Sequence, residues 1–301
     1  MSLDKPLDLE FIGKGSYGII MRKKTNGLFH VIKQFRIEYY EDNTTSFDKE
    51  VTHAKSAYNI NKDIFINILK EEMSSENLAN KIDINVPLIN CISVNNFGYI
   101  HMEYMNEGDL YNFIKTNNYF NLTGILGCYL NGLDILHNQL KIIHGDLTPS
   151  NILIHYIGPN YRQKIIINNE IYYFDTNGYI YKIADFGLVE LIKDTKYKRN
   201  YRNHLYRDYL LLYFLYFNKN KFYNYNKFVD LIELSIGQIN DDIYDGYGNT
   251  EDYQKYFIDE YNYRSVCKFM NIYLESDFDN ALIYKVPNIL LNEFIDIMTL
   301  I

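Results

Sequence analysis

Two short polar motifs limit most strongly what this chain can fold into. The first is "HGDLTPSN", residues 144–151, and the second is "DFG", residues 185–187. Each follows an apolar, strand-like run, and Asp185 lies 34 positions after Asn151. The two motifs therefore predict one site in which Asp146, Asn151 and Asp185 act together.

The side chains of these three residues suit the transfer of a phosphoryl group. That reaction needs positioning and charge neutralisation more than covalent help from the protein. Asp146 can accept or orient the proton of an attacking hydroxyl group. Asn151 and Asp185 offer hard oxygen ligands, which suit Mg²⁺ beside phosphates.

A glycine-rich stretch, "GKGSYGII" at residues 13–20, lies far upstream. Alone it is a weak signal, because a tight β-turn could use Gly13, Gly15 and Gly18 equally well. Lys33, 15 residues past Gly18, strengthens it. Its position matches that of a lysine that holds ATP phosphates under such a loop. The alternative is a solvated lysine on the surface of a sheet.

A phosphate-binding lysine needs a carboxylate to orient it. Glu50, in "FDKEV", lies 17 residues after Lys33 and can face the sheet from a helix. Glu41 and Asp48 are poorer candidates, and Glu50 could instead be a solvated helical residue. We expect Lys33 to pair with Glu50.

Hydrophobic periodicity predicts a sheet-rich part followed by a helical part. Residues 7–36 alternate apolar runs with glycine-bearing turns, as an antiparallel sheet does. The stretch 44–69 then has apolar residues at helical spacing, and strands are predicted at 88–94 and 97–104. The clearest helical segments after Asp109 are 109–117, 122–140 and 207–217. Segment 157–182 is predicted to form an extended β-hairpin, with turns at Asn168–Asn169 and Asp175–Gly178.

The predicted fold is therefore α+β and bilobal. Residues 1–102 form a small antiparallel-sheet lobe with one main helix, 103–108 a hinge, and 109–301 a larger helical lobe. The 301 residues and the 47% hydrophobic content suffice for a sizeable core.

Charge and composition narrow the class of protein. The net charge of −8 gives no global basic footprint, so nucleic acid is not an expected partner. Segment 193–207 is locally basic and is either a solvated loop or a docking patch for an acidic or phosphorylated partner or RNA. No apolar stretch approaches the roughly 20 residues of a membrane span.

The remaining composition favours an intracellular protein. The start of the chain carries no pattern typical of a secretory signal. The cysteines Cys91, Cys128 and Cys267 are odd in number and far apart, which indicates reduced thiols. The chain has 31 Tyr and no Trp, a bias typical of an AT-rich genome such as that of a virus or parasite. We expect a cytoplasmic protein, in the host cytoplasm or the virion if it is viral.

Taken together, these motifs resemble those of the eukaryotic-type protein kinases, from Ile12 to about the helices near residue 300. The resemblance implies that Met102 is the gatekeeper of the hinge. It also implies that Ala54, His144 and Phe186 belong to a regulatory spine. The implied catalytic residues are Asp146, Lys33, Glu50 and Thr148, and the implied Mg²⁺ ligands are Asn151 and Asp185. The implied ATP-binding residues are Ile12, Gly13, Lys14, Gly15, Ser16, Gly18, Ile20, Val31, Lys33, Met102, Glu103, Met105 and Leu153, with Glu103 and Met105 using backbone groups.

The chain departs from that family pattern in its catalytic loop. Gly145 stands where many kinases have an Arg that pairs with a phosphorylated activation loop, so such a switch is not expected. Thr148 replaces a Lys that commonly touches the γ-phosphate, which should lower the rate rather than ATP binding. The "HGDLT" form is similar to the loop of the small kinase of the KEOPS complex, and "HGD" is also similar to vaccinia-related kinases.

The segment after "DFG" is short. Asp208 follows Asp185 by 23 positions, and no A-P-E motif lies between them. Asp208 resembles a buried helical Asp that receives backbone amides of the catalytic loop, although it could simply be an acid at a helix N-terminus.

Three functions remain open on these grounds. The first is a serine/threonine-type protein kinase that uses ATP and Mg²⁺ on a protein substrate. The second is a pseudokinase that acts as a binding module, and the third is a small-molecule kinase on the same fold.

Overall fold

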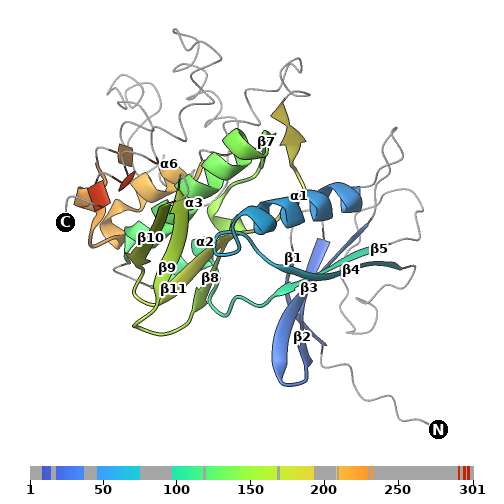
Figure 1. The fold of residues 1–301 in the computed structure, drawn as a ribbon. Helices are drawn as coiled ribbons and strands as arrows, with labels where there is room; N and C mark the ends of the chain where they lie inside the picture. The colour runs from blue at the N-terminus through green and yellow to red at the C-terminus, as the bar shows by residue number, and fades with distance from the viewer. Residues whose placement is uncertain are drawn as a thin grey trace, which may run out of the picture. The chain divides into compact units, whose positions relative to one another are not determined.

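The computed structural model describes residues 9–14, 18–36, 46–74, 97–117, 120–167, 170–192, 208, 210–229, 231–232, 291, 294–295 and 297–298. The chain divides into two compact units (Figure 1). The N-terminal unit comprises Met1–Lys62 and Ile66–Met105, and the C-terminal unit comprises Asp63–Phe65 and Asn106–Ile301. Among the described residues, no helix is long and apolar enough to cross a membrane.

The N-terminal unit is built on a five-stranded antiparallel sheet with the order β1-β2-β3-β5-β4. Its strands are β1 (Leu9–Lys14), β2 (Gly18–Thr25), β3 (Leu28–Arg36), β4 (Ile68–Ser74) and β5 (Phe97–Glu103). The Asn26–Gly27 turn joins β2 to β3 with positive φ angles of 52° and 83°. Asn-Gly is the pair that a two-residue hairpin turn of this kind favours.

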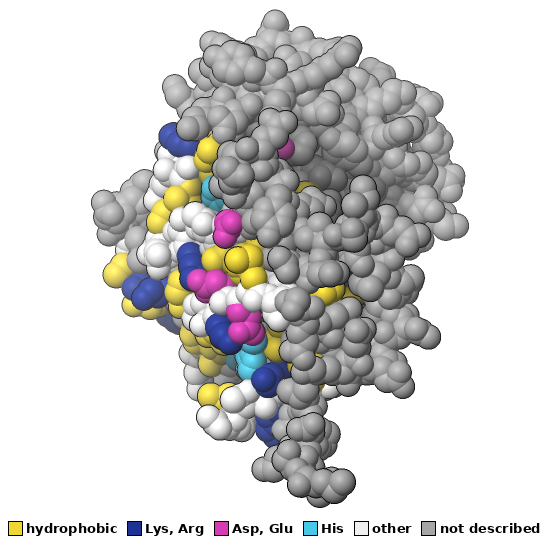
Figure 2. All heavy atoms as spheres, turned by 90° about the vertical axis from the view of Figure 1, so that its right-hand side faces the viewer, with side chains coloured by type: hydrophobic (Ala, Val, Ile, Leu, Met, Phe, Trp, Pro, Cys, Tyr) yellow, Lys and Arg dark blue, Asp and Glu magenta, His cyan; other side chains and the backbone are white. Residues whose placement is uncertain are grey.

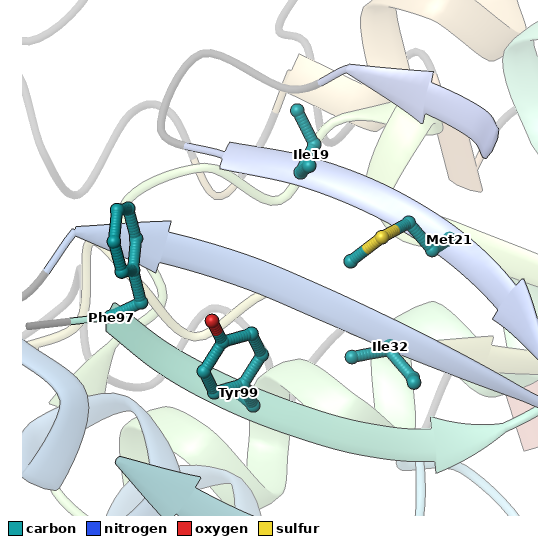
Figure 3. Close-up of a cluster of buried hydrophobic side chains, with 5 residues drawn as sticks. All are labelled: Ile19, Met21, Ile32, Phe97 and Tyr99. Atoms are coloured by element: carbon teal, nitrogen blue, oxygen red, sulfur yellow. The ribbon is translucent and has the colours of Figure 1, made fainter. Parts of the chain in front are cut away.

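Both faces of this sheet bury apolar side chains. Helix α1 (Ser46–Ile60) lies on one face (Figure 1), where Phe47 and Val51 pack with Phe35 and Ile100. Side chains alternate between the faces of a strand. The opposite face therefore carries a second cluster of buried residues, shown in Figure 3: Ile19, Met21, Ile32, Phe97 and Tyr99.

The prediction for segment 44–69 was wrong in its second half. Helix α1 ends at Ile60, and the chain then returns to the sheet as β4. The apolar side chains of β4, Leu69 and Met73, are 54% and 57% exposed, so this edge strand lacks the alternating apolar pattern of a half-buried strand. The strand predicted at 88–94 lies outside the described residues.

In the described part of the C-terminal unit the α-helices are α2 (Leu110–Thr116), α3 (Leu122–Asp134) and α6 (Leu210–Phe217). Asp109 and Asn121 cap α2 and α3 by accepting hydrogen bonds from backbone amides of the first turns. A π-helical turn, Ile135–Gln139, continues α3. All three helices lie where the sequence pattern predicts them.

The strands that the structure describes in the C-terminal unit form three small sheets. Strands β6 (Gly108–Asp109), β8 (Ile152–Tyr156) and β11 (Tyr179–Ile183) make one sheet in the order β11-β8-β6. Strands β9 (Arg162–Ile167) and β10 (Glu170–Asp175) pair with each other, as do β7 (Ile142–Ile143) and β12 (Glu190–Leu191). The predicted hairpin in 157–182 is therefore β9–β10, whereas β11 returns to pair with β8.

The α+β class predicted from the sequence is confirmed. Among the described residues, the N-terminal unit is an antiparallel sheet with helix α1, and the C-terminal unit contains helices α2, α3 and α6 and several short sheets.

Candidate active site

The register of the N-terminal sheet places several predicted nucleotide-binding residues on one face. Ile20 of β2 lies directly opposite Lys33 of β3, and Val31 lies directly opposite Met102 of β5. Residues two apart on a strand share a face. This face is also the one that α1 covers, because Phe35 of β3 packs against α1.

Lys33 is paired with Glu50 of α1. Lys33 Nζ lies 2.7 Å from Glu50 Oε1, and the exposed fraction of each side chain is 7%. Asp48 is exposed, and Glu41 lies outside the described residues. A buried ammonium group needs such a partner, because an unpaired charge in a protein interior is strongly unfavourable. The pair therefore fixes the position of the lysine ammonium group.

Asn67, which no motif in the sequence marks, holds the end of β5. Asn67 N–H donates to the Glu103 carboxylate at 2.7 Å, and Glu103 N–H donates to the Asn67 carbonyl at 3.1 Å. The Glu103 amide is thus engaged within the protein. The expectation that backbone groups of Glu103 and Met105 bind adenine stays a prediction.

The structure describes part of the glycine-rich stretch. Gly13 lies beside an irregularity in the β1–β2 register, and Ile12 is 44% exposed. Gly18 packs tightly against β3, since a Cβ atom at this position would lie 2.3 Å from the Gln34 carbonyl oxygen. Gly15 and Ser16 lie outside the described residues.

In the C-terminal unit, Asp208 organises the loop that carries Asp146. Asp208 is fully buried, and its carboxylate accepts the backbone N–H groups of His144 and Gly145, each at 2.8 Å. The same carboxylate lies 2.8 Å from His137 Nε2. The prediction that Asp208 receives catalytic-loop amides is confirmed.

The paired ends of β8 and β11 bring together Asp146, Asn151 and Asp185. Asn151 Nδ2 donates to the Asp146 carbonyl at 2.7 Å and to Asp146 Oδ2 at 3.0 Å. The Ala184 N–H donates to the Asn151 carbonyl at 2.9 Å, which places Asp185 next to Asn151. Asp185 has a positive φ of 64°. Non-glycine residues in this region are uncommon, and they cluster at functional sites.

Two of the three predicted spine residues are in contact. The rings of His144 and Phe186 lie 5.0 Å apart, and His144 Nε2 lies 3.1 Å from the Ala184 carbonyl oxygen. Ala54, the third, is buried within the N-terminal unit. The contacts of His144 hold the backbone immediately before Asp185.

Thr148 and Leu153 flank Asn151 in the sequence. Thr148 is buried, and its N–H donates to the Asp146 carbonyl at 2.8 Å, just before the 3₁₀ turn Pro149–Asn151. Leu153 lies on β8 opposite Lys182 of β11 and is partly exposed.

The donor atoms in this cluster fit Mg²⁺. The Asn151 amide nitrogen is used on Asp146, so the atom that it offers a metal is its amide oxygen. Asp185 offers a carboxylate. Mg²⁺ is commonly held by one or two such groups together with substrate phosphates. In the part of the chain that the structure describes, no three His, Cys, Asp or Glu side chains form a self-contained metal site.

Cys128 is the described cysteine, and it does not act as a reactive group in this cluster. Burial raises the pKa of the Cys128 thiol well above its ordinary value, so this cysteine is a packing residue rather than a nucleophile. Cys91, Cys267 and the basic segment 193–207 lie outside the described residues.

Charges of both signs lie close together on the N-terminal unit. Lys55 of α1 pairs with Glu71 of β4, and Lys70 pairs with Glu72. Figure 2 shows basic and acidic side chains next to one another among the described residues on the side that it views. These pairs balance charge locally.

The chain is similar to several protein kinases. It is 32% identical over 165 residues to a candidate serine/threonine-protein kinase of Acanthamoeba polyphaga mimivirus, R517/R518, which covers 51% of this chain. It is 28% identical over 159 residues, half of this chain, to the mitosis inhibitor protein kinase SWE1 of Candida albicans. A 64-residue stretch, 21% of this chain, is 34% identical to a candidate serine/threonine-protein kinase of Frog virus 3, 019R.

These matches span 34%, 13% and 8% of the relatives' own lengths, respectively. A sequence model of the protein kinase domain matches residues 7–208. That range contains the Lys33–Glu50 pair, the catalytic loop and the "DFG" motif. The chain therefore belongs to the protein kinase family.

Proposed function

We propose that this chain transfers the γ-phosphoryl group of ATP, with Mg²⁺, to serine or threonine hydroxyl groups of a protein substrate. The observation that carries the proposal is the cluster of Asp146, Asn151 and Asp185 at the paired ends of β8 and β11. The names of the two viral relatives support the serine/threonine preference.

The residues of the C-terminal unit have distinct roles in this reaction. Asp146 orients the substrate hydroxyl and accepts its proton as the oxygen attacks the γ-phosphorus and the bond to ADP breaks. The hydrogen bond from Asn151 holds the Asp146 carboxylate in place. Asn151 and Asp185 hold Mg²⁺, which neutralises charge on the phosphate oxygens when it is bound.

Residues of the N-terminal unit have their own roles in the proposed reaction. Lys33, held by Glu50, neutralises charge on the nucleotide phosphates. Ile20 and Val31 share the face of Lys33 and offer an apolar surface to adenine. Thr148 carries no charge where many kinases have a Lys, so we expect a slower reaction rather than weaker ATP binding.

A transfer assay tests this function. The purified chain is incubated with radiolabelled ATP and Mg²⁺, first with a panel of proteins and then with small alcohols. We expect label on serine or threonine of a protein, and we expect chelation of Mg²⁺ to abolish it. The Asp146→Asn variant should transfer about 10² to 10⁴ times more slowly, because it lacks the group that accepts the proton.

Each alternative has its own outcome in this assay. Label on small alcohols alone would identify a small-molecule kinase. ATP binding without transfer to any acceptor would identify a pseudokinase and contradict the proposal. Equal rates for Asp146→Asn and wild type would remove Asp146 from the mechanism.

A further inference from the structure

The side chain of Arg22, on β2, joins four segments of the N-terminal unit. Its Nε donates to the Glu10 carboxylate of β1 at 3.2 Å, and its Nη1 donates to the Tyr104 hydroxyl group at 2.9 Å. Its guanidinium carbon lies 4.8 Å from the centre of the Phe29 ring of β3 and 5.4 Å from that of the Tyr104 ring. The centres of the two rings are 5.6 Å apart, a distance typical of an aromatic pair. Arg22 therefore connects β1, β2 and β3 to the residue that follows β5.

This cluster lies at one end of the sheet face that we propose for the nucleotide. Arg22 is two residues past Ile20 on β2, and it lies directly opposite Val31 of β3. Residues two apart on a strand share a face, so Arg22 borders the apolar surface proposed for adenine. Phe29 and Lys33 lie two residues to either side of Val31. The Arg22 cluster and the lysine proposed for the phosphates are therefore at opposite ends of that surface.

The contacts of Arg22 with the two rings need a guanidinium group rather than a positive charge alone. The Glu10 side chain is 61% exposed, and an exposed ion pair contributes little to stability. A guanidinium group is planar and carries its N–H donors in a fixed fork, so it can stack on a ring while it donates to a hydroxyl group. A lysine ammonium group supplies the charge but not both contacts at once.

We propose that Arg22 is a positioning residue for the base of the nucleotide. By holding the Tyr104 ring beside Phe29, it fixes the end of β5 against β2 and β3 and so keeps the surface around Val31 in the shape that adenine meets. The inference rests on the proposed function for the identity of the nucleotide. Arg22 then affects how tightly the adenosine part binds, and leaves the binding of the phosphates and the rate of transfer from bound ATP unchanged.

Two ligands separate the base from the phosphates. Wild type and Arg22→Met are titrated by calorimetry with ADP and with inorganic tripolyphosphate, each in the presence of Mg²⁺. We expect Kd for ADP to rise about fivefold, as the loss of one hydrogen bond and of exposed cation–π contacts predicts. Kd for tripolyphosphate should stay unchanged, whereas a general weakening of the fold would raise both values.

Lys24→Met is the matched control. Lys24 Nζ lies 5.3 Å from the centre of the same Phe29 ring. The substitution removes a cation from this ring and leaves the hydrogen bond between Arg22 and Tyr104 in place. Kd for ADP and Kd for tripolyphosphate should both equal the wild-type values.

Two further variants test the contact itself. Tyr104→Phe keeps the ring and removes the hydroxyl group that accepts from Arg22, so Kd for ADP should rise about two- to threefold. Adding Tyr104→Phe to Arg22→Met should cause no further rise, because the contact is already lost. Arg22→Lys keeps the charge but not the fork, and its Kd for ADP should be close to that of Arg22→Met.

Hydrogen exchange gives a readout without a ligand, and kinetics give one with a substrate. The amides of residues 100–105 should exchange about threefold faster in Arg22→Met than in wild type, because the end of β5 is held less firmly. The amides of α1, residues 46–60, should be unchanged. In the transfer reaction Arg22→Met should raise KM for ATP and leave kcat as it is, because binding rather than chemistry is altered.

The outcomes separate the positioning role from the proposed function. Unchanged Kd for ADP in Arg22→Met, equal rises for ADP and tripolyphosphate, additive losses in the double variant, or wild-type binding by Arg22→Lys would each overturn the positioning role. Weaker ADP binding by Arg22→Met in a chain that transfers no phosphate would support the positioning role and overturn the proposed function. A wild-type chain that binds neither ligand would overturn both. If Arg22→Met does not fold, Tyr104→Phe carries the same comparison of the two ligands.

Discussion

Gly145 has a backbone role in addition to any effect on regulation. Its φ is +77°, and a Cβ atom would lie 2.6 Å from the Leu188 carbonyl oxygen. A left-handed conformation costs a residue with a side chain about 1–2 kcal/mol before any clash. The glycine therefore relieves both strain and crowding at a loop that Asp208 holds with two hydrogen bonds.

Replacing Gly145 by Ala should destabilise the C-terminal unit more than the same change at Gly108. Gly108 has nearly the same φ, +76°, but a Cβ atom there would have no neighbour within 4 Å. We expect a loss in the free energy of unfolding of about 1 kcal/mol for Gly108→Ala and about 2–3 kcal/mol for Gly145→Ala. Urea unfolding followed by circular dichroism measures both, and equal losses would show that the clash is relieved without cost.

The sequence predicts the charged residues of the site, because their spacing from a motif marks them. It does not predict the residues that hold neighbouring segments in place. Lys33, Glu50 and Asp208 are recognisable because a charged group stands at a defined distance from a motif. Asn67 is not, because it binds Glu103, which is distant in sequence, through its own backbone groups, and no local pattern marks such a partner.

The hairpin of β1 and β2 contains two described glycines with different surroundings. A Cβ atom at Gly18 would meet the backbone of β3, whereas nothing lies within 4 Å of one at Gly13. Gly18→Ala should therefore push β2 away from β3 and displace the loop between β1 and β2.

We expect Gly18→Ala to lower the free energy of unfolding by about 1–3 kcal/mol and to raise KM for ATP. Gly13→Ala should leave stability within about 0.5 kcal/mol of wild type. Thermal unfolding and ATP titration of both variants measure this. A Gly18→Ala protein as stable as Gly13→Ala would mean that the two strands separate without cost.

Elements with a clear apolar period are the ones that the sequence predicts. The segments that form α2, α3 and α6 bury apolar faces at helical spacing or on all sides. Strand β4 was missed because it is an edge strand with exposed apolar and charged side chains, so pairing with β5 rather than burial defines it.

The proposed reaction requires both units, because each holds part of the machinery. Lys33 and Glu50 belong to the N-terminal unit, and Asp146, Asn151 and Asp185 belong to the C-terminal unit. If Lys33 and Asp185 act on the phosphates of one nucleotide, their contributions to transition-state stabilisation cannot be independent. Residues that act as a unit are strongly non-additive.

A double-mutant cycle tests this coupling. Lys33→Met and Asp185→Asn should each lower kcat/KM. The fold-loss in kcat/KM of the double variant should be smaller, by at least about tenfold, than the product of the two single fold-losses. Lys33→Met combined with Tyr173→Thr, an exposed residue of β10, is the matched control and should be additive. Circular dichroism checks that each variant is folded. Additive losses in the Lys33–Asp185 cycle would show that the two residues do not serve a common nucleotide.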